Sequence, residues 1–523
     1  MGRKILFITT DQQRYDALGC NGGSIARTPV VDLLAATGVR YERAYCQNTV
    51  CMPARSTMLT GQYVRTHGVV ANGIPLPKDA PSVAASLADA DYRTALIGKA
   101  HFEPILDPDG RWTENRLAAE GSTGPYRGFE HVEFANHGPW GASHYARWFR
   151  EHHRDQSGGF ANIFDITPGG DTGAPEIAYN PVPRDLYHTD WVADRTIAWL
   201  DRLDPDDDWF CWMSFPDPHH PWDPPASERH RVDWRDLGLP AGHPGSDAAI
   251  REILGAKPGH WLAWYEGRIP NVDAAPGNFV PAQLEHDQLR EILALIHIEN
   301  ELIDEACGRV LDHIVGRGWD PDTDIFFTTD HGELQGDFGL LYKGPYHVDA
   351  LMRLPLIWRP APSAAIDPAV VQEPVGQLDL APTFCRIAGA DVPGAMQGEP
   401  LPTAPGSGRE RALCEWDSQL DTGYHLRSIV RDGWVCTVYE PSTPGAGLPA
   451  ADLLTLYGIT DPPDPVRYDG TEGELYDLEE DPHQWVNRWG DPSCASRKAD
   501  LIADLYDALP PARTPPLEPE SLA

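Results

Sequence analysis

The sequence predicts an α/β fold built on a large, mainly parallel β-sheet. Four short apolar runs, rich in β-branched and aromatic residues, have the composition of strands that are covered on both faces. Segments with helical hydrophobic periodicity lie between them, an alternation that is typical of mainly parallel sheets. Each apolar run ends in a polar cluster, and ligands bind beyond the carboxyl ends of such strands. We therefore expect the polar clusters to converge at one edge of the sheet.

The predicted elements follow in chain order. The strands are residues 4–10 before Asp11-Gln12, 94–98 before Lys99-Ala100-His101, 209–215 before Asp217-Pro218-His219-His220, and 324–329 before Asp330-His331. Helices are predicted over residues 82–90, 289–315 and 380–388, the last of which closes the main domain. Alternating segments near residues 427–430 and 434–439 then predict a smaller antiparallel sheet.

The length of 523 residues favours two domains, which we place at 1–405 and 406–523. Segments near 102–185 and 221–285 are rich in Gly, Pro, Trp and His and have weak periodicity. We interpret them as insertions that form the rim of the site, with plain surface loops as the alternative. The proline-rich tail from Pro510 onward is expected to be extended and to pack on a neighbouring subunit of a homo-oligomer.

The formal net charge of −36 excludes whole classes of partner. Nucleic acids and anionic membrane surfaces are bound through basic patches, so we expect neither as a partner. An anionic small-molecule substrate would require a local reversal of this field. We therefore looked for a metal site together with a cluster of Lys, Arg and His.

The nine cysteines are scattered without paired spacing, and an odd number suits a reducing compartment better than a disulfide framework. The apolar run at residues 5–10 is too short for the core of a signal peptide. No stretch is long and apolar enough to span a bilayer. These features predict a cytoplasmic location.

The run from Cys51 to Gly61 has the pattern of a reactive residue at the start of a short helix. Pro53 suits the first helical turn, where its missing N–H has no intrahelical partner, and Gly61 suits the left-handed stop. Cys51 is therefore expected at the positive end of the helix, with Arg55 one turn away, in a site prepared for an anion. The alternative interpretation is a buried structural cysteine.

The segment Cys51-Met52-Pro53-Ala54-Arg55, followed by Thr60-Gly61, resembles the signature of the type I sulfatases, which belong to the alkaline phosphatase superfamily. Ala54 stands where the family usually has serine, a departure that related bacterial enzymes share. The resemblance implies an α/β/α sandwich of the alkaline phosphatase type and hydrolysis of sulfate esters. It also implies that a formylglycine-generating enzyme oxidises Cys51 to Cα-formylglycine, whose hydrated aldehyde is the nucleophile.

Further segments resemble the family in the same order along the chain. They include Asp11-Gln12, Asn72, Gly98-Lys99-Ala100-His101, Pro218-His219-His220-Pro221, Asp330-His331-Gly332-Glu333, Lys343 and residues 474–482. The resemblance implies that Asn72 lies near the nucleophile and that Lys99, His101 and Lys343 contact the sulfate. It places His219 in the position of the leaving-group histidine, with His220 as the competing assignment.

A divalent metal ion is expected at the ends of two strands. Asp11, Gln12 and Asp330 offer the carboxylate and amide oxygens that a hard cation prefers, and His331 adds a nitrogen or a hydrogen bond. The Gln12 and His331 variants resemble those of phosphonate monoester hydrolases and some bacterial sulfatases. Many members of the family have Asp-Asp and Asp-Asn at these places. Compared with them, this chain has one carboxylate fewer and one imidazole more, which makes the metal site softer. Calcium is the first choice and manganese the alternative.

The residues suggest a two-step mechanism through a covalent adduct. One hydroxyl of hydrated residue 51 attacks sulfur while the metal, Lys99, Lys343 and Arg55 hold the sulfate oxygens. Asp330 takes the proton of that hydroxyl, and His219 protonates or hydrogen-bonds the departing alcohol or phenol. His101 then removes the proton of the remaining hydroxyl, and sulfate is expelled.

The same groups would suit phosphorus, so a phosphonate monoester hydrolase or phosphodiesterase is the alternative, together with a promiscuous enzyme that does both. Those hydrolases resemble this chain at Gln12, His331 and Lys343. They tend to carry Tyr and Thr at the positions of Lys99 and His101, which ranks sulfate esters first. A degenerate binding protein would have lost Cys51 or Asp330, and both residues are present.

Overall fold

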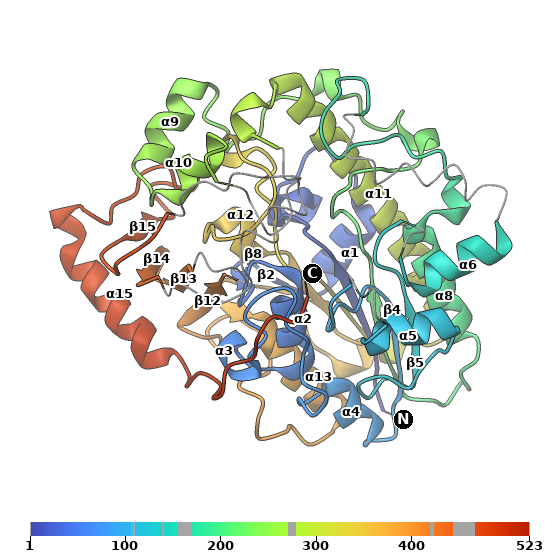
Figure 1. Ribbon diagram of the computed structural model, residues 1–523. Coiled ribbons are helices and arrows are strands. Elements are labelled where there is room, and N and C mark those ends of the chain that lie inside the picture. The colour runs from blue at the N-terminus through green and yellow to red at the C-terminus, as the bar shows by residue number, and fades with distance from the viewer. Residues whose placement is uncertain are drawn as a thin grey trace.

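The computed structural model describes residues 2–105, 107, 110–138, 141–153, 169–269, 279–418, 423–442 and 466–521. Within this part of the chain, the central sheet has eight strands in the order β10-β2-β9-β7-β1-β6-β4-β5. Figure 1 labels β2, β4 and β5 of this sheet and shows α15 (Ala495–Ala508) with β12 (Arg411–Asp417) to β15 (Gly473–Asp477) at one side of the molecule. Neighbouring strands are parallel except in the two pairs that involve β9. The strands are β1 (Lys4–Thr10), β2 (Val39–Tyr41), β4 (Arg93–Gly98), β5 (His131–Phe134), β6 (Trp209–Ser214), β7 (Thr323–Thr329), β9 (Leu356–Arg359) and β10 (Ala369–Val371).

The four strands predicted from the sequence are all present in this sheet. The bounds of β1 agree residue for residue, and those of β4, β6 and β7 agree to within one residue at each end. All seven residues of β1 are buried, because helices cover both faces of the sheet. The prediction of a mainly parallel sheet is therefore confirmed.

The helices come from segments between the strands, and none in the described part of the chain is long and apolar enough to cross a membrane. They are α1 (Pro29–Thr37), α2 (Cys51–Thr60), α3 (Val64–His67), α4 (Val83–Ala88), α5 (Thr113–Glu120), α6 (His144–His152), α8 (His188–Leu200), α9 (Asp247–Gly255), α10 (His260–Tyr265), α11 (His286–Gly316), α12 (Asp349–Met352), α13 (Leu380–Ala388) and α15 (Ala495–Ala508). The three predicted helices correspond to α4, α11 and α13, and Ser82 caps α4 through its hydroxyl.

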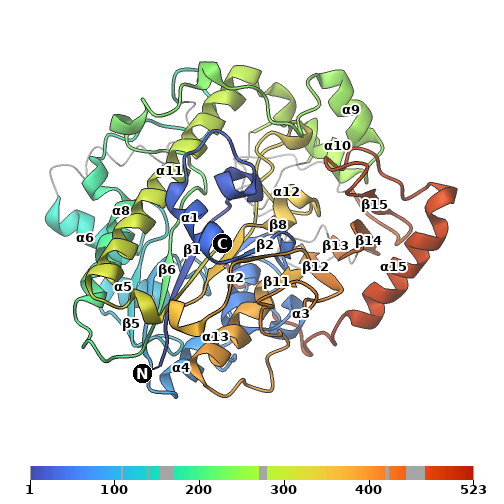
Figure 2. The ribbon, with the colours of Figure 1, turned by 180° about the vertical axis from the view of Figure 1, so that it is seen from behind.

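Alternation along β1 divides the core into two layers, since successive side chains of a strand point to opposite faces. Leu6 and Ile8 pack in a cluster with side chains of α1, α8 and α11. Ile5 and Phe7 pack on the other face with side chains of α2, α4 and α13. Figure 2 shows α11, with its 31 residues, running along the sheet. The result is the predicted α/β/α sandwich.

The segment 102–185 contributes more than a rim. Residues 131–134 form β5, which pairs in parallel with β4 at the edge of the main sheet. The prediction of insertions over this whole segment missed that strand because His131 and Glu133 interrupt its apolar pattern, and their side chains pair with each other at the sheet edge. Residues 139–140 and 154–168 of the segment lie outside the described residues.

Two smaller sheets complete the fold. β11 (Val375–Gly376), β3 (Ala44–Tyr45) and β8 (Arg353–Leu354) form one of them. The other is the predicted antiparallel sheet, built from β12 (Arg411–Asp417), β13 (His425–Arg431), β14 (Trp434–Glu440) and β15 (Gly473–Asp477). Helix α15 buries Leu501 and Leu505 against it, so this C-terminal unit has its own small core.

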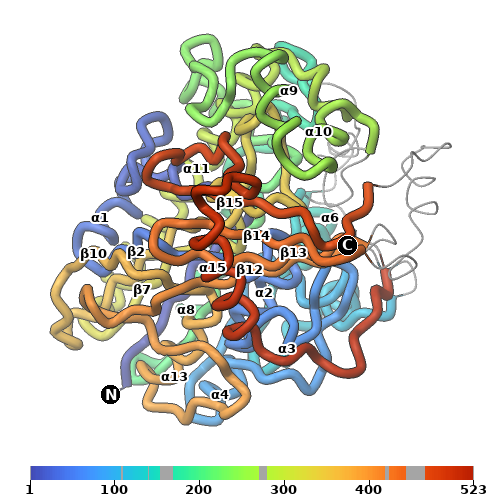
Figure 3. The backbone as a smooth tube through the Cα atoms, turned by 90° about the vertical axis from the view of Figure 1, so that its left-hand side faces the viewer, coloured from blue at the N-terminus to red at the C-terminus, as the bar shows by residue number. Residues whose placement is uncertain are grey.

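The tail after α15 is extended as predicted, but it packs on its own chain. The backbone N–H of Arg513 donates to the carbonyl of Arg65 at 2.7 Å, and that of Glu520 donates to the carbonyl of Gly73 at 2.9 Å. Figure 3 shows the tail running from α15 past α3. Within its own chain the tail thus finds hydrogen-bond partners at Arg65 and Gly73, and its packing on a neighbouring subunit stays a prediction.

A single added carbon at the end of β4 should disrupt the sheet. Gly98 has a φ of +108°, and a Cβ there would lie 1.7 Å from the carbonyl oxygen of Ser214. We expect Gly98→Ala to lower the free energy of unfolding by more than about 3 kcal/mol. Thermal and urea denaturation measure this loss. Gly255→Ala is the matched control, because a Cβ at Gly255 meets nothing within 4 Å; equal stability of the two variants would contradict the prediction.

Candidate active site

Five neighbouring strands deliver polar side chains to one edge of the central sheet. In the order β7-β1-β6-β4-β5, the residues that follow the strand ends are Asp330, Asp11, His219, Lys99 and His137. Because these strands run parallel, their carboxyl ends lie side by side. The predicted convergence of the polar clusters is therefore observed, and β5 extends it by one strand.

Cys51 begins α2, which brings it to this edge from one face of the sheet. Pro53 stands in the first turn, and Gly61 ends the helix in the left-handed conformation at φ 63°. The side-chain oxygen of Asn72 accepts the backbone N–H of Met52 at 3.0 Å, so Asn72 satisfies one of the unpaired donors at this helix start. The structure thus places Asn72 at the start of α2, beside the Cys51-Met52 pair.

Arg55 lies at the centre of the site and is fully buried. Its Nε donates to Asp330 Oδ2 at 2.9 Å, and its Nη2 donates to Asp11 Oδ2 at 3.2 Å. Its Nη1 donates to the carbonyl of Lys99 at 2.8 Å and to the hydroxyl of Ser214 at 2.9 Å. One guanidinium therefore ties together the ends of β7, β1, β4 and β6.

Two buried lysines lie at the site. Lys343 Nζ lies 3.2 Å from Cys51 Sγ, 2.9 Å from Gln12 Oε1 and 2.8 Å from His219 Nε2. Lys99 Nζ lies 2.6 Å from Asp11 Oδ2. The local balance is three cationic side chains, Lys99, Lys343 and Arg55, against the two carboxylates. The site therefore reverses the negative field of the whole chain.

A set of metal-ligand donors lies beside the thiol. One ligand atom each from Asp11, Cys51, Asp330 and His331 fall within 4.8 Å of one another, all of them buried. Asp11 Oδ1 faces Cys51 Sγ at 3.7 Å and His331 Nε2 at 3.9 Å. Carboxylate oxygens with one imidazole nitrogen fit a hard or borderline divalent cation. The fourth predicted ligand, Gln12, lies beside them: its backbone N–H donates to Asp330 Oδ1 at 3.0 Å, and its amide oxygen accepts a hydrogen bond from Lys343.

The electrostatics of the site follow from burial and these charges. Burial would raise the pKa of Asp11, but Lys99, Arg55 and Lys343 outweigh it and hold that pKa well below its usual value. Burial and Asp11 raise the pKa of the Cys51 thiol to about 11, so the unmodified thiol is protonated at neutral pH. Burial and neighbouring cationic or imidazole groups also lower the pKa of the histidines His101, His137, His219 and His220 well below the usual value.

The two candidate leaving-group histidines have different partners. His219 Nδ1 lies 2.5 Å from the carbonyl oxygen of His220, which leaves Nε2 facing Lys343. His220 Nδ1 lies 3.3 Å from the side-chain nitrogen of Gln12. The rings stack with centroids 4.0 Å apart. Both histidines thus lie at the site, and His219 is the one in contact with a predicted sulfate-binding lysine.

Backbone strain gathers at this edge. Gln12, His101 and Tyr342 have φ values of 64°, 57° and 69°, a region that residues other than glycine rarely adopt. Each one stands beside a predicted site residue or is one. Such strain persists where surrounding contacts hold the backbone in place, and it is typical of functional sites.

The loop that carries His101 is held by a buried carboxylate from α5. Glu114 Oε2 accepts the backbone N–H of His101 at 3.2 Å, and Oε1 accepts those of Phe102 and Glu103 at 2.9 and 3.2 Å. Within the described residues, neither ring nitrogen of His101 has a hydrogen-bond partner. The ring is therefore placed by its backbone and left available to a bound molecule.

Sequence reasoning missed two residues that order the site, His137 and Glu114. The Nε2 of His137 lies 3.5 Å from Lys99 Nζ, and its ring centroid lies 4.6 Å from that of His219. The available signal was a polar residue three positions after the short run His131–Phe134, but that run was not recognised as a strand. Glu114 was missed because its role depends on backbone N–H groups, which carry no sequence pattern.

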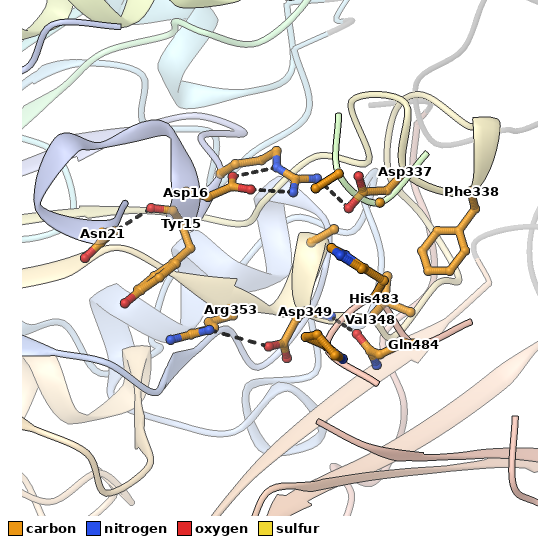
Figure 4. Close-up of a pocket in the computed structure, with 15 residues that line it drawn as sticks. Tyr15, Asp16, Asn21, Asp337, Phe338, Val348, Asp349, Arg353, His483 and Gln484 are labelled. Atoms are coloured by element: carbon orange, nitrogen blue, oxygen red, sulfur yellow. Dashed lines mark hydrogen bonds and ion pairs between the residues drawn. The ribbon is translucent and has the colours of Figure 1, made fainter. Parts of the chain in front are cut away.

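A separate cavity of about 270 Å³ lies elsewhere, between the main domain and the segment after β15 (Figure 4). Arg14, Asp337, Asp349, Arg353 and Gln484 line it, and no predicted site residue does. Its two arginines are already engaged, with Arg14 bound to Asp337 at 2.9 Å and Arg353 paired with Asp349 at 3.8 Å. It therefore offers no unpaired cation to an anionic substrate.

Fold and site together define an α/β protein with a buried, cation-rich centre at the carboxyl ends of its parallel strands. Comparison with known proteins agrees, because a family model described as sulfatase matches residues 3–390. An arylsulfatase of Clostridium perfringens is 28% identical over 411 residues, which are 76% of this chain and 77% of that protein. A multifunctional alkaline phosphatase superfamily protein of Trinickia caryophylli is 25% identical over 509 residues, covering 95% and 93% of the two chains.

Among solved structures, a phosphonate monoester hydrolase from Silicibacter pomeroyi superposes with a TM-score of 0.74. It covers 97% of this chain and 94% of its own, at 24% identity, and so shows a shared fold. The chain belongs to the sulfatase family. This membership confirms the predicted family, the predicted fold and the predicted enzyme class, a hydrolase that acts on sulfuric ester bonds.

The pH dependence of stability should change when Glu114 becomes glutamine. Burial and the neighbouring Glu103 raise the pKa of Glu114 from 4.5 to about 7. The folded protein therefore holds this proton more tightly, so its stabilising contribution is complete below pH 4.5 and is lost as the pH rises through about 7. Melting temperatures across that interval should fall less steeply for Glu114→Gln than for the wild type. The exposed Glu120 supplies the control Glu120→Gln, and identical slopes for all three proteins would refute the assignment.

Proposed function

We propose that the protein hydrolyses sulfate monoesters with a formylglycine hydrate at position 51 as nucleophile and one bound divalent cation. The observation that carries this proposal is the position of Cys51. Its Sγ, which marks where the reacting oxygen of residue 51 would lie, is 3.2 Å from Lys343 Nζ and 3.2 Å from His331 Nε2. The nucleophile, the anion-binding cations and the metal donors thus share one buried volume.

Asp11, Asp330 and His331, with Gln12, would hold the metal. When bound, a divalent cation supplies positive charge to the oxygens that gain charge in the transition state. We propose Ca²⁺ as the first choice, since the set is dominated by oxygen donors, and Mn²⁺ as the alternative because His331 contributes nitrogen.

Lys99 and Lys343 are proposed to hold the sulfate oxygens, because Lys343 Nζ lies 3.2 Å from Cys51 Sγ and the charge of Lys99 partly offsets the rise that burial causes in the pKa of the same thiol. For Arg55 we propose a role that differs from the sulfate contact expected from the sequence. Four of its five N–H groups are engaged with Asp330, Asp11, the Lys99 carbonyl and Ser214, and the side chain is fully buried. Arg55 therefore fixes the carboxylates and the Lys99 backbone, and the two lysines bind the substrate.

Proton transfers are assigned to three residues. Asp330 is proposed to accept the proton of the attacking hydroxyl, and His101 that of the second hydroxyl. His219 is proposed to protonate or hydrogen-bond the departing oxygen through Nε2, since its Nδ1 is bound to the carbonyl of His220. The overall reaction consumes one water and releases sulfate and the free alcohol or phenol.

Phosphonate monoesters and phosphodiesters are the second candidate substrates. Their supporting observation is the shared fold of the phosphonate monoester hydrolase, together with Gln12 and His331 in the metal set. Lys99 and His101 favour sulfate, because phosphonate monoester hydrolases tend to carry Tyr and Thr at these two positions. A promiscuous enzyme that acts on both classes stays the intermediate case.

Maturation of Cys51 would require a formylglycine-generating enzyme as a transient partner. We also place the protein in the cytoplasm, a proposal that the nine unpaired cysteines support. Association into a homo-oligomer stays a prediction.

Mass spectrometry of the peptide that contains Cys51 tests the nucleophile. Co-expression with a formylglycine-generating enzyme should convert the thiol to an aldehyde, with activity rising in proportion to the converted fraction. Cys51→Ala, which can be neither converted nor activated, is the control for background hydrolysis. A fully active preparation with an unmodified Cys51 would exclude the mechanism.

Metal dependence tests the role of Asp11. We expect Asp11→Ala to lose the bound divalent ion and to reduce kcat/KM by at least about 10³-fold, since it removes charge stabilisation from the transition state. Elemental analysis and assays before and after chelation measure both effects. Undiminished turnover in an exhaustively chelated, metal-free enzyme would overturn this part of the proposal.

Substrate preference tests which acid is cleaved. A sulfate monoester spreads one negative charge over three oxygens, which two lysines and a metal suit, whereas a phosphonate replaces one oxygen by an apolar group. We expect kcat/KM for an aryl sulfate to exceed that for the matching phenyl phosphonate. Lys99→Ala should reduce sulfate hydrolysis more than phosphonate hydrolysis. A wild-type preference for the phosphonate would put the second candidate function in first place.

A further inference from the structure

His137 is the site residue that neither the mechanism above nor the sequence motifs account for. It follows β5, the edge strand of the central sheet, and stands in the loop after the strand end. Only 8% of its surface is exposed, so it is not a surface histidine that happens to lie nearby. Its ring lies between Lys99 on one side and His219 on the other.

The contacts of Lys99 show what this histidine does. An ammonium group has three N–H donors and no acceptor. One donor of Lys99 is directed to Asp11 Oδ2 at 2.6 Å, and a second reaches His137 Nε2 at 3.5 Å. With two of the three directions set by protein acceptors, the third is set as well. Burial and Lys99 lower the pKa of His137 well below its usual value, so the ring is neutral. Because the ammonium of Lys99 can only donate, the contact assigns the unprotonated nitrogen of this ring to Nε2.

We propose that His137 is a positioning residue for Lys99: its Nε2 accepts one N–H of the ammonium and so directs the remaining N–H to an oxygen of the transferred sulfate. This inference deepens the proposed function, on which it rests. It gives β5 a part in the site and explains why a neutral acceptor, rather than a second carboxylate, stands beside Lys99. A carboxylate there would cancel the charge that the anionic substrate requires.

A double-mutant cycle between His137 and Lys99 tests the proposal. If His137 acts through Lys99, His137→Ala should reduce kcat/KM for an aryl sulfate roughly tenfold in the wild-type background. In the Lys99→Ala background the same substitution should change kcat/KM by less than about twofold, because the group that it positions is gone. His137→Gln, which keeps an acceptor, should recover part of the loss. Equal losses in both backgrounds would overturn the proposal.

Leaving-group dependence separates this role from acid catalysis. Lys99 would act on the non-bridging oxygens, so the loss in His137→Ala should be the same for phenols of low and high pKa. A variant at His219 should instead lose more activity as the phenol becomes a poorer leaving group. If the His137→Ala loss grows with the phenol pKa, His137 acts on the departing oxygen and the positioning role is wrong.

His131→Ala is the matched control. His131 begins β5, the strand that His137 follows; it is equally exposed at 8% and pairs with Glu133 outside the site. His131→Ala should leave kcat/KM unchanged even where it lowers the melting temperature.

If the wild type cleaves phenyl phosphonates and not aryl sulfates, the proposed function fails by itself. The same cycle is then measured on the phosphonate, where equal losses in both backgrounds would still overturn the positioning role.

Discussion

The buried ion pairs of Arg55 are the interaction on which the site depends. Asp11 and Asp330 follow neighbouring parallel strands, so the sheet brings two carboxylates together in a volume without solvent. Two such charges repel each other and resist burial. The guanidinium between them, at 2.9 and 3.2 Å, removes that conflict. Removing one partner of a buried ion pair typically lowers the free energy of unfolding by about 3–5 kcal/mol, so the Arg55 ion pairs and the fold depend on each other.

The Arg55 ion pairs also explain how a chain with a net charge of −36 can bind an anion. Arg55 satisfies one oxygen of each carboxylate from within the protein, and Lys99 and Lys343 add positive charge on the side of residue 51. The remaining oxygens face the cluster of metal donors. The local field is thus opposite to that of the surface, and a bound divalent cation would strengthen it.

Much of the fold was predictable because its signals are local. Continuous apolar runs marked β1, β4, β6 and β7, and the residues after them converge because parallel strands share an edge. β5 escaped because a strand at a sheet edge carries polar residues such as His131 and Glu133. The two groups that order the site, His137 and Glu114, escaped because tertiary contacts with Lys99 and with backbone N–H groups define their roles. The role of Arg55 as an internal anchor was also readable only from its partners.

A crystal structure of the matured protein, grown with calcium and soaked with sulfate, tests the central claim most directly. The claim is that Arg55 holds the carboxylates while residue 51, the metal donors and the two lysines enclose the anion. The account predicts one metal ion bound by Asp11 and Asp330, and a sulfate in contact with Lys99 and Lys343 beside residue 51. It also predicts an unchanged Arg55, still bound to both carboxylates. A sulfate held by Arg55 itself, or a metal bound away from the two carboxylates, would contradict it.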